Sequence, residues 1–202
     1  MGIYKQVDNA SLEKLKRLWN NKTPKWADSR GLLIEEVGYA LSKIKPDGVK
    51  FLKTFAYSED NEKRGWAVYF LADKGVVEDD VIKYLIDMFS SNDKMLKNLA
   101  LWGFINVDHF PIQRSVIENL MNNEDERLAA LALVYLSYAY PEEAVQLLQE
   151  GLLSSNPRKR EYACDEVGNR KIYQLKQYLV NLLTDPDEYV VQSASINLEG
   201  FK

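Results

Sequence analysis

Residues 156 to 168 read NPRKREYACDEVG, and residues 185 to 200 read DPDEYVVQSASINLEG. In both stretches a helix-capping Asn or Asp stands seven residues before an alanine, Ala163 or Ala194, and a bulky apolar residue follows four residues later. Asn and Asp accept hydrogen bonds from the free N–H groups at a helix start, and residues three or four apart share one helix face. The two stretches therefore predict two helices of the same kind in the same register.

The same frame recurs through the rest of the chain. Its alanines are separated by 33, 30, 33 and 31 residues and are Ala67, Ala100, Ala130, Ala163 and Ala194. The capping column is Asp60, Asp93, Asn123, Asn156 and Asp187, and the column between cap and alanine is Arg64, Lys97, Arg127, Arg160 and Val191. The apolar column is Val37, Leu71, Phe104, Val134, Val167 and Leu198, and the frame extends upstream to Arg30 and Leu33. Such a period predicts a repeat architecture.

Each repeat is expected to hold two short helices. The first carries the cap and the alanine, which lets neighbouring helices approach closely, and the second carries a plain amphipathic stripe. No run alternates as a strand does, and all six prolines are expected at helix starts: Pro24 after Thr23, Pro157 after Asn156, Pro186 after Asp185, and Pro46, Pro111 and Pro141 before apolar runs. The predicted fold is all-α.

These residues resemble the HEAT-like repeats, in the short form found in bacterial proteins and in phycobiliprotein lyases. The signature of that family, Asp, then Val-Arg, then Ala, then Leu-Gly, is matched by the two stretches quoted above, and the resemblance covers roughly residues 23–202. It implies an α-α superhelix, a HEAT-like solenoid of about five to six helical hairpins in one domain, with the second helices on the concave side. Residues 1–22 are expected to hold a capping helix over Ser11 to Asn20.

Composition excludes several classes of function. Lys and Arg number 26 against 30 Asp and Glu, giving a net charge of −4, so no global positive field attracts nucleic acid. One histidine, His109, and one cysteine, Cys164, cannot build a disulfide or a Cys/His zinc cluster, and no metal or cofactor is expected. No apolar run of about 18 residues predicts a membrane span, so a cytoplasmic protein is expected.

Polar residues of the second helices are the candidate partner-binding surface. Aligned on Leu52, Leu85, Val116, Leu148 and Leu179, two columns flank the apolar stripe, and two tyrosines lie beside them. The candidates are Lys50, Lys83, Tyr84, Asp87, Arg114, Glu118, Gln146, Glu150, Gln177 and Tyr178. Two alternatives stay open: the columns can be a solvated face with pairs such as Lys83 with Asp87, and the tyrosines can be core.

No motif for catalysis emerges from the sequence. Phosphate loops and nucleophile elbows do not occur, His109 is interpreted as a turn residue, and Cys164 as a small buried side chain.

The leading hypothesis is a non-catalytic module, monomeric when free, that binds another protein through its concave face. A bacterial immunity protein that neutralises a basic toxin is the second hypothesis. An alkylpurine DNA glycosylase or a bilin lyase is disfavoured, because a basic stripe and a distinctive catalytic residue are missing.

Overall fold

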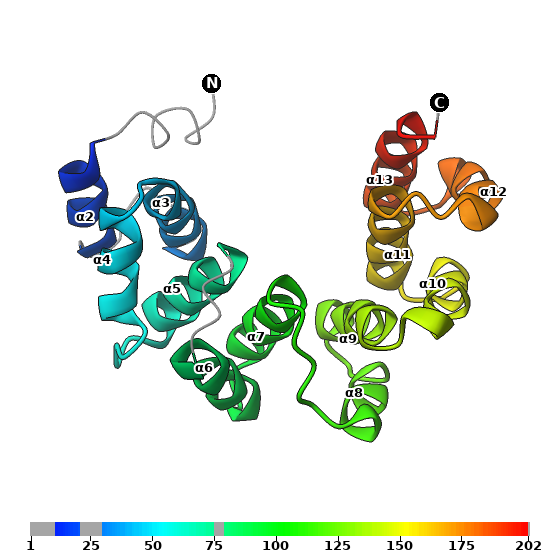
Figure 1. The fold of residues 1–202 in the computed structure, drawn as a ribbon. Helices are drawn as coiled ribbons and strands as arrows, with labels where there is room; N and C mark the ends of the chain where they lie inside the picture. The colour runs from blue at the N-terminus through cyan, green and yellow to red at the C-terminus, as the bar shows by residue number, and fades with distance from the viewer. Residues whose placement is uncertain (1–10, 21–29, 75–78, 202) are drawn as a thin grey trace. The chain divides into compact units, whose positions relative to one another are not determined.

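The computed structural model describes residues 11–20, 30–74 and 79–201, and every regular element within them is a helix (Figure 1). The all-α prediction is confirmed. Where the sequence predicted one array over residues 23–202, the chain divides into two compact units, Met1–Val107 (unit 1) and Asp108–Lys202 (unit 2). Residues 107–113 at the boundary are not helical, and Asp108 adopts a left-handed backbone with φ of 51°. This irregular connection interrupts the third predicted repeat.

Unit 1 contains α2 (Leu12–Asn20), α3 (Arg30–Lys43), α4 (Asp47–Phe55), α5 (Asn61–Asp73), α6 (Asp79–Ser90) and α7 (Lys94–Asn106). The first helices α3, α5 and α7 pack on one another in sequence, α4 packs on α3 and α5, and α6 packs on α5 and α7. A helix is present where the sequence predicted one: α2 buries Leu15 and Trp19 and contacts α3 and α4. The remainder of the predicted cap, residues 1–10 and 21–22, and Pro24 lie outside the described residues.

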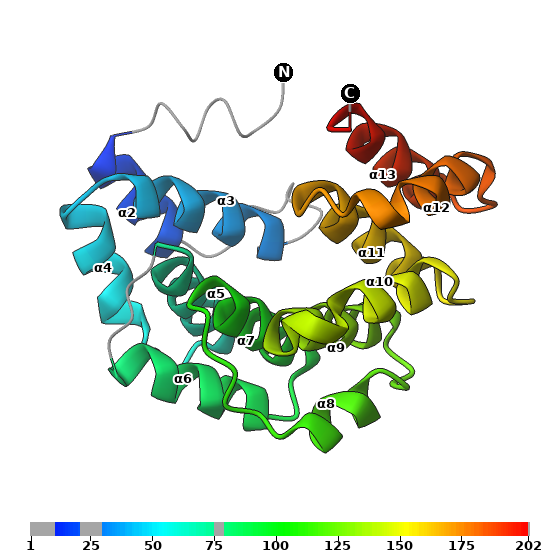
Figure 2. The ribbon, with the colours of Figure 1, turned by 45° about the vertical axis from the view of Figure 1, so that its right-hand side comes forward.

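Unit 2 contains α8 (Arg114–Leu120), α9 (Glu126–Ala139), η1 (Pro141–Glu143), α10 (Ala144–Leu152), α11 (Pro157–Asn169), η2 (Tyr173–Leu175), α12 (Lys176–Asn181), η3 (Leu182–Thr184) and α13 (Glu188–Glu199). The first helices α9, α11 and α13 form one row, and the second helices α8, α10 and α12 form the other (Figures 1 and 2). Between the rows lies a core that includes Leu133, Leu148, Val167 and Leu179.

The alanine column is buried in both units. Ala67, Ala100, Ala130, Ala163 and Ala194 are all 0% exposed. In unit 2, α11 packs along both α9 and α13, whereas the second helices α10 and α12 touch only slightly. A closely packed row lies inside a curve and a divergent row outside it, so the second helices form the outer row of this unit. The expected concave placement of the second helices is therefore wrong within unit 2.

Each first helix from α5 onward begins with the same local structure. The capping side chain accepts hydrogen bonds from backbone N–H groups of the first turn, and the residue two positions earlier accepts the N–H of the cap itself, an Asx-type or Ser-type turn. The pairs are Ser58 with Asp60, Ser91 with Asp93, Asn123 with Asp125, Ser154 with Asn156, and Asp185 with Asp187. Four predicted caps are confirmed, but the cap of α9 is Asp125 and not Asn123, because this connection has a different length.

Asp185 illustrates what these turns add to the packing between repeats. Its carboxylate accepts two hydrogen bonds from Arg160, each at 2.8 Å, and also the N–H of Asp187, which is the cap of α13. Burial acts to raise the pKa of Asp185, but the hydrogen bonds from Arg160 and Asp187 outweigh it and hold this pKa below its usual value. Arg160, a member of the basic column, thereby joins α11 to the turn that precedes α13.

Gly168 permits the close contact between α11 and α13. A Cβ atom at this position would lie 2.1 Å from Oδ1 of Asn197, so any side chain would displace α13. Asn197 in turn donates to Asp165 at 2.9 Å, and Ser193 donates to the same oxygen at 2.6 Å. This polar network aligns the two helices, since a shift along the helix axis would leave the partly buried Asp165 carboxylate without donors.

Glu166 is a buried acidic residue of unit 2. It is 5% exposed, and its Oε2 atom has no hydrogen-bond partner in the described part of the chain. Burial raises the pKa of Glu166, and the hydrogen bond from Tyr138 and the charge of Arg170 offset this only in part. Arg170 stacks on the Tyr138 ring at 4.9 Å and donates to Ser137 at 3.0 Å. Burial between α9 and α11 therefore favours the protonated form of Glu166 more than solvent would.

We expect Ala194→Leu to lower the free energy of unfolding by roughly 1 to 3 kcal/mol, because three added carbon atoms overpack the core of unit 2, where Ala194 is fully buried. The matched control is Ser195→Leu, one position along the same helix, where the side chain is exposed. Urea denaturation of both variants measures the difference. Equal stability of the two variants would contradict the register of the alanine column.

We expect Glu166→Gln to raise the melting temperature at pH 7 and to have little effect near pH 4. A carboxyl with a raised pKa in the folded state stabilises fully below its ordinary pKa of 4.5 and loses that contribution as the pH rises through the folded-state pKa. Glutamine mimics the protonated acid and keeps the acceptor for Tyr138. Thermal melts between pH 4 and pH 8 test this, with the exposed Glu199→Gln as control. A melting difference independent of pH would refute the assignment.

Candidate functional site

The candidate residues from the sequence all lie on second helices. They are Lys50 on α4, Lys83, Tyr84 and Asp87 on α6, Arg114 and Glu118 on α8, Gln146 and Glu150 on α10, and Gln177 and Tyr178 on α12. The structure brings four of them together, Arg114, Glu118, Gln146 and Glu150, around one groove of unit 2. This groove is the candidate site.

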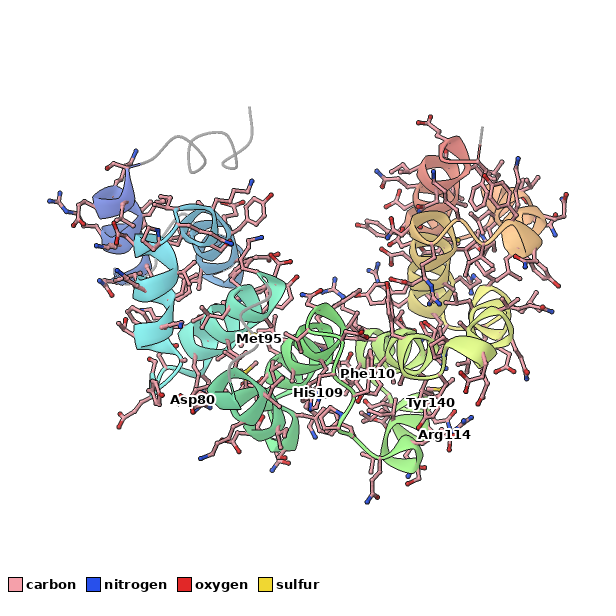
Figure 3. All side chains as sticks on the ribbon, in the orientation of Figure 1. Asp80, Met95, His109, Phe110, Arg114 and Tyr140 are labelled. Atoms are coloured by element: carbon pink, nitrogen blue, oxygen red, sulfur yellow. The ribbon has the colours of Figure 1, made fainter. Side chains whose placement is uncertain are left out.

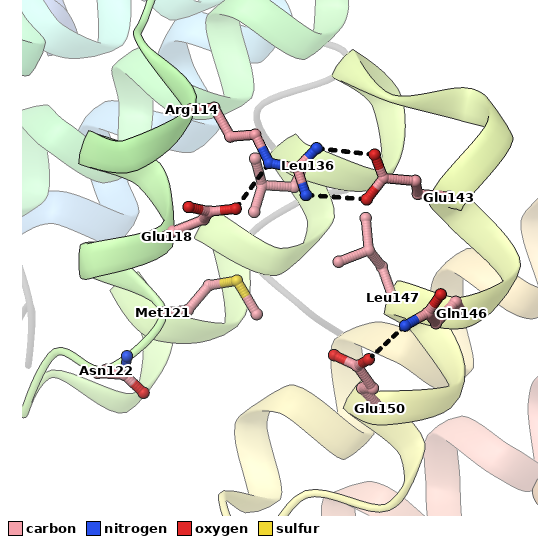
Figure 4. A pocket seen from close by; sticks show the side chains of 9 residues that line it. All are labelled: Arg114, Glu118, Met121, Asn122, Leu136, Glu143, Gln146, Leu147 and Glu150. Carbon is pink, nitrogen blue, oxygen red and sulfur yellow. Dashed lines mark hydrogen bonds and ion pairs between the residues drawn. The ribbon is translucent and has the colours of Figure 1, made fainter.

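The groove, named here the α8/α10 groove, has a volume of about 300 Å³ (Figure 4). It is lined by Arg114, Glu118, Met121, Asn122, Leu136, Glu143, Gln146, Leu147 and Glu150. One wall is α8 with the turn that follows it, and the other is η1 with α10. The buried side chains of Leu136 from α9 and Leu147 from α10 give the groove an apolar floor. The site exists because α8 and α10 are second helices, which diverge while α9 fills the space behind them.

Arg114 joins the two walls of the groove. Its Nη1 and Nη2 atoms donate to the two carboxylate oxygens of Glu143 at 2.7 and 2.8 Å, and its Nε donates to Glu118 at 2.6 Å (Figure 4). The guanidinium also lies over the Tyr140 ring at 4.6 Å, and both residues are labelled in Figure 3. Bidentate contacts of this kind fix orientation as well as charge. Arg114 therefore sets the distance between α8 and η1.

The groove is acidic in spite of Arg114. Three carboxylates, Glu118, Glu143 and Glu150, line it together with one guanidinium, which leaves two negative charges when all are ionised. The hydrogen bond from Arg114 lowers the pKa of Glu143, and the hydrogen bonds to Glu143 and Glu118 raise the pKa of Arg114, so this ion pair stays charged at neutral pH. Gln146 donates to Oε1 of Glu150 at 3.1 Å. An electropositive group is the ligand that this lining favours.

The other candidates are placed differently. Lys50, Lys83 and Asp87 are exposed on α4 and α6, while Gln177 donates to Asn181 at 3.3 Å on α12. Tyr178 is partly buried and packs against the core of unit 2, so the core alternative holds for this residue.

Tyr84 lines a smaller cavity of unit 1, of about 60 Å³. Its ring meets the ring of Tyr57 edge-on at 4.9 Å, and the Tyr57 hydroxyl donates to Asp80 at 3.3 Å. Tyr57, which is 67% exposed, did not stand out in the sequence. Because it follows α4 in a short turn, no helical period marks it as a surface residue.

The structure corrects the alignment of α8. Val116, taken as the stripe position, is 41% exposed, whereas Ile117 is 0% exposed and occupies the buried position held by Leu148 in α10. The column residues of α8 are thus shifted by one, and Arg114 lies one residue further from the stripe than predicted. Glu143 is not among the residues that the sequence suggested for the site. Its pairing with Arg114 joins positions 29 residues apart, which no local pattern reveals.

His109 and Cys164, the residues with reactive side chains that the sequence singled out, both lie where the sequence predicted. His109 is exposed in the connection before α8 (Figure 3), as expected for a turn residue. Cys164 is 0% exposed, as predicted, and burial raises the pKa of its thiol to about 12. Within the described ranges no group of three His, Cys, Asp or Glu residues is arranged to hold a metal ion. Nor is any of the helices described here both long enough and apolar enough to cross a membrane.

Comparison with known proteins gives information about the fold alone. No family model matches the sequence, and no curated protein matches it significantly. The chain is similar to the X-ray structure of YibA from Escherichia coli, a structural genomics target, with a TM-score of 0.56 and 17% identity over 98% of this chain and 73% of that chain. A crystal structure of an engineered protein aligns over 96% of both chains with 19% identity, but its TM-score of 0.42 carries no weight. At 17% identity the first likeness shows a shared fold alone.

Proposed function

We propose that this chain is a non-catalytic protein-binding module of the HEAT-like type, which acts in the cytoplasm and holds a partner protein at the α8/α10 groove. The observation that carries the proposal is the groove itself. It combines an apolar floor, Leu136 and Leu147, with charged walls tied together by Arg114. Concave sites with apolar lining and a few fixed polar groups are where proteins bind their ligands.

The side chains of the groove suit recognition better than chemistry. Arg114 is held by two carboxylates, through three of its five N–H donors, and by the Tyr140 ring, so its orientation is fixed. Arg, Tyr and Met are enriched at protein interfaces, and Met121 adds a side chain that adapts to the shape of its ligand. The hydrogen bonds of Glu118, Glu143 and Glu150 within the groove are to Arg114 and Gln146, which are not general bases or nucleophiles.

A bacterial immunity protein is the second candidate, and the charge of the groove favours it. The chain has a net charge of −4, and the groove adds a local excess of carboxylates over cations. Toxins that act on nucleic acid are basic proteins, because they must neutralise phosphates, and an acidic groove complements such a surface. The same charges weigh against the DNA glycosylase hypothesis, since Glu118 and Glu150 repel a phosphate backbone.

We expect Gln146→Trp to weaken binding of the partner at least about tenfold, because the indole fills the groove and removes contacts worth about 1.4 kcal/mol or more. Gln177→Trp is the matched control: it makes the same change at the corresponding exposed position of α12, outside the groove. Affinity capture from cells that express the protein, followed by titration of the captured partner, measures the effect.

Thermal melts of both variants show whether the fold is kept. The proposal fails if the partner binds the Gln146→Trp protein as tightly as the Gln177→Trp protein while both melt like the unmodified chain.

A further inference from the structure

The walls and floor of the α8/α10 groove differ in chemistry, and the two together define a ligand. The walls carry Glu118 on α8 and Glu150 on α10, while Met121, Leu136 and Leu147 lie between them (Figure 4). A side chain that fits must have a long apolar stem and a positive end. Lysine and arginine are the protein side chains of this kind.

We infer that the groove receives an arginine side chain of the partner, with its methylenes on Met121 and Leu147 and its guanidinium between Glu118 and Glu150. The inference rests on the proposed function and specifies the chemistry of the partner at that site. Charge complementarity carries it, because one added cation lowers the local excess of two negative charges to one.

The existing hydrogen bonds leave acceptors for such a ligand. In the described structure Glu118 accepts from Arg114 through Oε1, and Glu150 accepts from Gln146 through Oε1, so an Oε2 atom on each wall can accept from a newcomer. The Glu118 side chain is 48% exposed, and Glu150 is exposed as well, so both can be reached from solvent. A guanidinium carries five N–H donors in one plane and can bond to two carboxylates at once, which a lysine ammonium does less well.

Other occupants fit less well. An acidic side chain would face three carboxylates, a repulsion that the single cation Arg114 does not cancel because Glu143 and Glu118 already neutralise it. A wholly apolar side chain would satisfy Leu136 and Leu147, but it would remove water from Glu118 and Glu150 without replacing their hydrogen bonds. Unlike these occupants, an arginine side chain can pack on the floor and bond to both walls, and it bonds to two carboxylates better than lysine does.

The experiment titrates the full chain with N-acetyl-arginine methylamide and follows the methyl signals of Met121 and Leu147 by NMR. The neutral analogue N-acetyl-norleucine methylamide and the acidic N-acetyl-glutamate methylamide are the comparison probes. We expect the arginine probe alone to move these signals, and to bind about three- to tenfold more weakly to Glu150→Gln and at high salt. Glu142→Gln, the same charge change at an exposed residue of η1 outside the lining, should bind like the unmodified chain.

Several outcomes overturn the inference: the norleucine probe moves the signals equally, no arginine-induced shift occurs up to the solubility of the probe, or Glu150→Gln binds arginine unchanged. The affinity of the captured partner for two variants distinguishes failure of this inference from failure of the proposed function. If Gln146→Trp loses the partner while Glu150→Gln keeps it at full affinity, the groove binds a protein but not through an arginine. If Gln146→Trp keeps the partner, the proposed function itself is wrong.

Discussion

The rest of the structure depends on the contact between successive first helices. In unit 2, α11 packs along both α9 and α13. It lies closest to α13 at Gly168, where a Cβ atom would lie 2.1 Å from Oδ1 of Asn197. Ala163 and Ala194 are fully buried in the core of this unit, which is packed too densely for larger side chains. Because the first helices close up, the second helices must splay, and the space between them becomes surface.

The α8/α10 groove is a result of that asymmetry. The second helices pack on the first helices but scarcely on each other, so a further interaction must fix the distance between them. Between α8 and α10 this is the ion pair of Arg114 with Glu143. Between the next two repeats the corresponding tie lies on the first-helix side, where Arg160 reaches Asp185. The two ties use the same chemistry, but only the first leaves its carboxylates beside an open groove, so repeats of one plan present different surfaces.

The sequence was sufficient for features that depend on local spacing. The alanine column, the caps at Asp60, Asp93, Asn156 and Asp187, and the N-terminal helix over Leu12–Asn20 all follow from periods and from capping chemistry, and the structure has each of them. The errors in counting residues follow the irregular connection before α8, where Asp108 adopts a left-handed conformation. Counting from neighbouring repeats misplaced both the buried position of α8 and the cap of α9. The site needed more than spacing, because it depends on side chains of different repeats meeting in space. Resemblance to HEAT-like repeats remains an inference from the sequence motifs.

Cys164 has a practical consequence for the study of this fold. It is the single cysteine of the chain, its side chain is fully buried among Leu148, Val167 and Leu179, and its thiol is protonated at neutral pH. A thiol in this state reacts with a labelling reagent only when α11 separates from its neighbours. The labelling rate of the unmodified protein therefore reports the opening equilibrium of unit 2, residue-specifically and without any mutation. Measured with and without a bound partner, the same rate would show how strongly occupation of the groove is coupled to the repeat junction behind it.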